Sequence, residues 1–174
     1  MFGQARTKSI SGIEIQCPAS QLRVLVVDGR DNLRSVMRPT LQKLGIGDFD
    51  EAGTVVQGLA MLKDPDGKDY DLVICGSAGP ELDPLAFCNR VRRTAALRNK
   101  QIPILVLTGE EDRLLLDVVM DAGASAVMSR SVSAAELLKR IERAVGICFD
   151  QAVRAVARPR PRLAMHAFTR PFGW

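Results

Sequence analysis

Five short apolar runs alternate along the chain with five segments in which apolar residues recur at helical spacing. Each run is bounded by turn residues, as is typical of a strand that is buried on both faces of a sheet. Strands that alternate with helices predict an α/β domain, in which helices cover both faces of a parallel sheet. The expected strands are 23–28, 49–52, 72–75, 103–107 and 126–128.

Residues suited to begin a helix precede several of the helical segments. A short polar side chain can accept a hydrogen bond from the first free amides of a helix, and proline is tolerated at its first position. Glycine after a helix can adopt the left-handed conformation that ends it. The expected start residues are Thr54, Asp83 followed by Pro84, and Ser133 with Glu136, and Gly123 is an expected end.

Composition divides the 174 residues into a body and two extensions. Residues 21–149 form one predicted domain with a net charge of −1, and 47% of the whole chain is hydrophobic. Residues 1–20 are predicted to be a flexible N-terminal extension. Residues 150–174 hold five arginines and one acid, so this tail supplies the basic character of the chain.

The composition also excludes several classes of protein. No apolar run approaches the ~18 residues of a membrane helix, and the N-terminus does not resemble a signal peptide. The four cysteines show no CxxC spacing, so we expect reduced thiols, with Cys75, Cys88 and Cys148 buried, in a cytoplasmic protein. The one histidine, His166, lies in the tail, which argues against a histidine metal site or a catalytic triad.

The third strand is followed by a position of special interest. In open parallel sheets, chemistry takes place in the crevice outside the carboxyl ends of the strands. Asp28 ends the first strand at this edge, whereas Gly76 directly follows the third strand. Glycine has no side chain, so the central position of this crevice offers no reactive group.

Residues 23–145 resemble the receiver domain of bacterial two-component response regulators, including the chemotaxis regulators. The resemblance implies a flavodoxin-like, doubly wound sheet of five parallel strands in the order 2-1-3-4-5. The segments that carry it occur in order at the family's spacing. They are Val24–Asp28, Asp71–Ile74, Pro80, Ile104–Gly109 and Asp121–Ser125.

The family's chemistry is phosphotransfer, assisted by Mg²⁺, to an aspartate after the third strand. At the positions that carry this chemistry, Asp28 matches the first metal-binding acid, but Gly29 replaces the second and Gly76 replaces the acceptor. Thr108 matches the conserved hydroxyl, and Arg130 stands in place of the lysine. We therefore expect a degenerate receiver, or pseudo-receiver, that is not an enzyme and has no metal site or cofactor.

The expected replacement for the metal is an arginine. The Arg130 side chain is long enough to enter the space at Gly76 and pair with Asp28, which would otherwise be an unpaired carboxylate in a partly dry crevice. The alternative is a solvated Arg130.

A receiver without phosphotransfer is expected to act in two-component (phosphorelay) signalling as a protein-interaction module. Its expected partners are a histidine kinase, a phosphotransferase or a motor component, and a homodimer is a further candidate. The family usually binds partners through its fourth helix, fifth strand and fifth helix. We expect Leu114 or Leu116, with Val127, on this face, and Val118 in the buried stripe, although all of these residues could be core.

The tail supports a second functional hypothesis. Its arginines are interleaved with prolines and aromatic residues. Arginines can bind phosphates, and aromatic side chains can stack on bases. The tail loosely resembles arginine-rich tails of receivers that bind cyclic di-GMP, so it could bind a nucleotide or nucleic acid. A solubilising tail and a tail that docks on a protein remain alternatives. The candidate ligand-binding residues are Arg158, Arg160, Arg162, Arg170 and Trp174.

Overall fold

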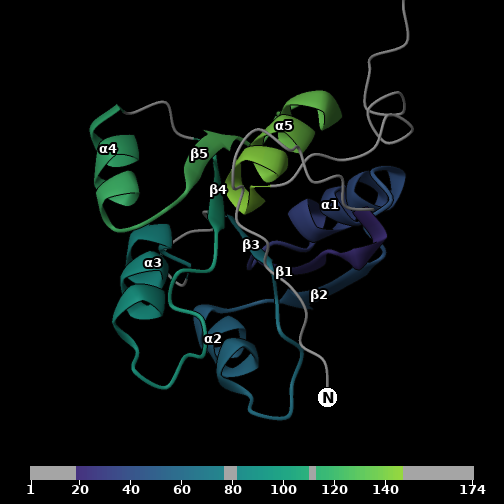
Figure 1. The fold of residues 1–174 in the computed structure, drawn as a ribbon. Helices are drawn as coiled ribbons and strands as arrows, with labels where there is room; N and C mark the ends of the chain where they lie inside the picture. The colour runs from purple at the N-terminus through teal and green to yellow at the C-terminus, as the bar shows by residue number, and fades with distance from the viewer. Residues whose placement is uncertain (1–18, 77–81, 110–112, 147–174) are drawn as a thin grey trace, which may run out of the picture.

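The computed structural model describes residues 19–76, 82–109 and 113–146 (Figure 1). Five strands alternate with five helices, after a short 3₁₀ helix at Ala19–Gln21. The strands are β1 (Arg23–Val27), β2 (Asp48–Ala52), β3 (Leu72–Gly76), β4 (Ile104–Thr108) and β5 (Ala126–Ser129). The helices are α1 (Asp31–Lys43), α2 (Val55–Lys63), α3 (Pro84–Arg93), α4 (Arg113–Asp121) and α5 (Ala134–Val145).

The strands form one parallel sheet in the order β2-β1-β3-β4-β5. This is the order that the resemblance implied, so the prediction of a doubly wound, flavodoxin-like sheet is confirmed. Strands β1, β3 and β4 lie in the middle, and their residues are almost fully buried. Continuous apolar runs in these strands follow from burial on both faces.

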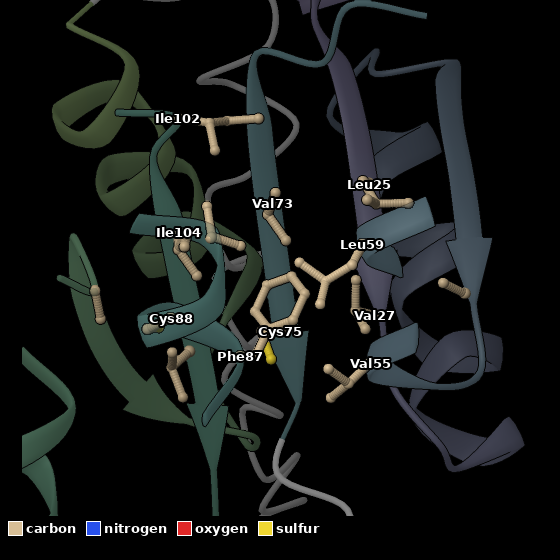
Figure 2. Close-up of a cluster of buried hydrophobic side chains, with 14 of the residues drawn as sticks. Leu25, Val27, Val55, Leu59, Val73, Cys75, Phe87, Cys88, Ile102 and Ile104 are labelled. Atoms are coloured by element: carbon tan, nitrogen blue, oxygen red, sulfur yellow. The ribbon is translucent and has the colours of Figure 1, made fainter. Parts of the chain in front are cut away.

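Two hydrophobic layers hold the helices to the sheet. On one face α1 and α5 pack on alternate residues of the central strands, and on the other face α2, α3 and α4 do so. Figure 2 shows the second layer, in which Phe87 of α3 and Leu59 of α2 lie over Val27 and Val73. Cys75 and Cys88 are free, buried thiols of this layer, as predicted.

The predicted helix starts are confirmed by hydrogen bonds. Thr54 accepts from the amide of Gln57, Asp83 accepts from that of Leu85, and Ser133 accepts from that of Glu136. The polar side chains satisfy amides that have no partner within the helix, and so fix where α2, α3 and α5 begin.

Several strands extend one residue further than the sequence indicated. Strand β3 includes Gly76, and β2 begins at Asp48. Residues 1–18 of the N-terminal extension, Cys148 and the whole tail with its arginines and Trp174 lie outside the described residues. In the part that is described, no helix is both long and apolar enough to cross a membrane.

Candidate functional site: a crevice at the carboxyl ends of the strands

The crevice lies at the carboxyl ends of β1, β3 and β4. The pairing of Val27 with Cys75 places the next residues of the two strands, Asp28 and Gly76, beside each other. The amide of Asp28 donates to the carbonyl of Ala52, 3.0 Å away, so the backbone continues the sheet pattern past the end of β1. The position of Asp28 is therefore set by strand register.

The Asp28 side chain occupies the space that a side chain at position 76 would need. A Cβ atom built on Gly76 would overlap Oδ2 of Asp28, and it would also stand 3.0 Å from Cδ2 of Leu33. Asp28 is fully buried, with 0% of its surface exposed. The crevice is thus closed at its centre by the carboxyl group of Asp28, packed against the bare backbone of Gly76.

Asp28 has only part of the hydrogen bonding that a buried carboxylate requires. Its Oδ1 accepts from the amide of Arg30 at 2.7 Å, but its Oδ2 has no partner among the described residues. Burial raises the pKa of the Asp28 carboxyl, because the charged form loses its water. The Arg30 amide and the charges of Arg130, Arg30 and Arg34 lower this pKa again, but only in part.

Arg130 lies at the same edge of the sheet without pairing with Asp28. Its amide donates to the carbonyl of Thr108 at 3.1 Å, and its Nη1 would be 3.8 Å from a Cβ on Gly109. The described residues form no ion pair within 4.0 Å between Asp28 and Arg130, and the buried Nε of Arg130 has no hydrogen-bond partner there. The predicted ion pair is therefore wrong: Asp28 turns into the space at Gly76, and Arg130 acts on it only through the field of its charge.

The described side chains of the crevice do not fit a magnesium ion. Mg²⁺ is usually bound through carboxylates and waters in octahedral geometry. Gly29 supplies no side chain, and the carboxylate of Asp31 is 90% exposed and pairs with Arg34. Among the described residues no three His, Cys, Asp or Glu side chains gather where they could hold a metal ion.

A second feature lies on the other side of β4, where α4, β5 and α5 meet. A cleft of about 470 Å³ is lined there by eight residues. It brings together two of the residues predicted for the partner face, Leu116 and Val127, whereas the side chain of Leu114 is outside the description. The lining residues are Leu116, Met120, Ser125, Ala126, Val127, Arg140, Arg143 and Ala144.

The residues of α4 differ in one respect from the predicted stripe. Val119 is 2% exposed and packs in the core, but Val118, which was predicted for the buried stripe, is 46% exposed. Neighbouring residues of a helix point about 100° apart, so only one of the two can face the sheet directly. Arg140 and Arg143 of the cleft were not predicted, although their spacing of three on α5 places both on one side of that helix.

Comparison with known proteins agrees with this fold. The Rhizobium etli protein described as a probable chemotaxis protein CheY is 26% identical over 128 residues, which cover 74% of this chain and 95% of that protein. Chemotaxis protein CheY-3 of Vibrio cholerae is 25% identical over 122 residues, covering 70% of this chain and 90% of that protein.

Solved structures with the same fold include chemotaxis response regulator CheY4 of Vibrio cholerae, with 25% identity and a TM-score of 0.61 over 71% of this chain and 98% of that one. The receiver domain of a Pseudomonas aeruginosa sensor histidine kinase, solved with magnesium in its active-site cleft, has 21% identity and a TM-score of 0.61, covering 72% and 98% of the two chains. Residues 24–142 match the family described as the response regulator receiver domain. The chain therefore belongs to the response regulator receiver domain family, whose members serve two-component signalling.

Proposed function

We propose that this chain is a degenerate receiver, which takes no phosphoryl group and works by binding protein partners in a single conformation. The observation that carries the proposal is the arrangement of Asp28 and Gly76. The acceptor position has no side chain, and the buried carboxyl of Asp28 fills the space in which one would stand. No nucleophile can reach a phosphodonor from that position without moving Asp28.

The other requirements of phosphotransfer support the same proposal. The transferred phosphoryl group needs cations to neutralise its developing charge, and in receivers a metal ion held by acids supplies this. Asp28 faces the interior and Gly29 has no side chain, so the described residues offer no acidic pair for such an ion. Thr108 and Arg130 remain at the crevice, but in receivers the residues at these positions stabilise the phosphoryl group and do not accept it.

The cleft between α4, β5 and α5 is the surface on which we propose that a partner binds. Its apolar part includes Leu116, Met120 and Val127, and its cationic part is formed by Arg140 and Arg143. A surface of this kind can bury apolar side chains and pair with acids of a partner. Receiver domains in general bind histidine kinases or phosphotransferases, so we propose a signalling protein of that class as the partner.

A phosphorylation assay tests the proposal directly. The full chain is incubated with Mg²⁺ and a small phosphodonor such as acetyl phosphate, and intact mass spectrometry records any added phosphoryl group. We expect no heavier species, because the acceptor carboxylate is absent. A phosphorylatable receiver in the same tube serves as the positive control. An aspartyl-phosphate on any residue of this chain would refute the proposal.

A further inference from the structure

Arg92, near the end of α3, is tied to two other parts of the chain. Its Nε and Nη2 both donate to the carbonyl oxygen of Gly123, at 3.2 and 2.5 Å. Its Nη1 donates to the carbonyl of Lys100 at 2.6 Å. One guanidinium thus joins α3 to the loop before β4 and to the turn between α4 and β5.

The contact with Gly123 is closely fitted. Gly123 has a φ of +102°, and a Cβ atom there would stand 2.7 Å from Nε and 2.9 Å from Cγ of Arg92. Only glycine can adopt this conformation without strain and leave room for the arginine. The Arg92 side chain is partly buried, and this burial lowers the pKa of its guanidinium.

The turn held by Arg92 ends helix α4. The amides of Ala122, Gly123 and Ala124 donate to the carbonyls of Val118, Met120 and Val119. On either side of this turn stand residues of the cleft, Met120 before it and Ser125 after it. The position of the turn therefore sets how far apart these two walls of the cleft lie.

We propose that Arg92 is a positioning residue, which clamps the α4–β5 turn and thereby holds the cleft in one shape. Hydrogen bonds from a charged donor are stronger than neutral ones, and a forked donor also fixes direction. The described residues give Arg92 no carboxylate partner within 4.0 Å, so the clamp works through backbone carbonyls alone. The functional meaning of the clamp rests on the proposed function, because that proposal makes the cleft a docking surface.

Amide hydrogen exchange on the isolated full chain tests the clamp without any partner. Arg92→Met keeps most of the aliphatic stem and removes the donors. We expect exchange at Ala122, Gly123 and Ala124 to become faster by on the order of tenfold, while amides of β1 keep their protection. Arg93→Met is the matched control: it removes the next arginine of the same helix, which is exposed and has no described ion pair, and should change none of these rates.

A second variant tests the proposed clamp if Arg92→Met does not fold. Arg92→Lys keeps the charge and a long stem but cannot make the forked contact, so it should also speed exchange at the turn and shift the NMR signal of the Met120 methyl group. Unchanged exchange and an unchanged methyl signal in either folded variant would overturn the proposal. Because no phosphodonor or partner is present, this result is independent of whether the crevice accepts phosphate.

Discussion

Oδ2 of Asp28 stands in the space that a Cβ atom of residue 76 would fill, so a side chain at position 76 is excluded unless the Asp28 carboxyl turns away. The exclusion follows from register, since β1 and β3 pair Val27 with Cys75 and leave the next two residues side by side. The same contact makes Asp28 a buried carboxyl, one oxygen of which has no hydrogen-bond partner in the part of the chain that the structure describes. Three of the predictions below test this relationship, and a fourth tests the cleft.

Gly76→Ala should destabilise the protein by roughly 1–3 kcal/mol, because one added methyl group overfills a packed site. Urea unfolding gives the change in free energy. Gly47→Ala is the matched control, since a Cβ at Gly47 has no atom within 4 Å. The destabilisation should shrink when Gly76→Ala is combined with Asp28→Ser, which vacates the space. Equal effects of Gly76→Ala in both backgrounds would contradict the exclusion.

The charge on Asp28 should make the protein less stable as the pH rises. Burial raises the pKa of the Asp28 carboxyl, so the folded state keeps this proton to a higher pH than the unfolded chain. Protonated Asp28 contributes its full stabilisation below the ordinary aspartate pKa of about 3.9. This contribution is lost as the pH rises through the raised pKa of Asp28 in the folded state.

Asp28→Asn removes that charge and keeps an oxygen for the Arg30 amide, so its stability should depend less on pH. Urea unfolding from acid to mildly alkaline pH should show the free energy of unfolding of Asp28→Asn increasing relative to that of the wild type as the pH rises. Asp66→Asn, in an exposed loop, controls for the general loss of a negative charge. Parallel curves for Asp28→Asn and the wild type would show that this carboxyl titrates normally.

Gly76→Asp should not restore phosphotransfer. The new carboxylate would enter a space already filled by Asp28, and two like charges in a buried site repel each other strongly. Gly29 would still leave the metal without its second acid. Amide NMR spectra with Mg²⁺ and beryllofluoride provide the measurement, and we expect no widespread shifts. Widespread, saturable shifts in the amide spectrum of Gly76→Asp would contradict this prediction, because they would mean that the crevice can still bind Mg²⁺ and beryllofluoride.

Leu116→Glu should abolish binding of a kinase or phosphotransferase domain that the wild type binds, because it replaces an apolar wall of the cleft with a charge that can also occupy Arg140 and Arg143. Titration calorimetry measures the binding, and circular dichroism shows whether the fold survives. Val36→Glu is the control, because Val36 is an apolar residue of α1 that is 56% exposed and does not line the cleft. A folded Leu116→Glu with full affinity would place the docking surface elsewhere.

The sheet could be predicted from the sequence because strands that are buried on both faces consist of continuous apolar runs. The apolar runs of β1, β3 and β4 and the polar caps Thr54, Asp83 and Ser133 each point to one local structure. Local preference and global fold agree at these positions, so the local structure there can be predicted from the sequence alone.

The interior of the crevice could be predicted only in part. The absence of a side chain at Gly76 is plain in the sequence, but which neighbour fills the space depends on competing rotamers. Arg130 was the predicted occupant, and Asp28 occupies the space because it is directly adjacent across the sheet. Two further features depend on how α3 and α4 pack: the exposure of Val118 and the hydrogen bonds from Arg92 to Gly123. The spacing of residues along the chain does not specify this packing.

The filled space at Gly76 also bears on how such a protein can change over generations. In a receiver that has lost its acceptor, a neighbour that settles into the gap turns the reverse substitution into a steric conflict. Recovery of an acceptor then also requires the Asp28 carboxyl, which matches the family's first metal-binding acid, to turn out of this space. The packing of one carboxyl group thus opposes the return of an acceptor side chain at position 76.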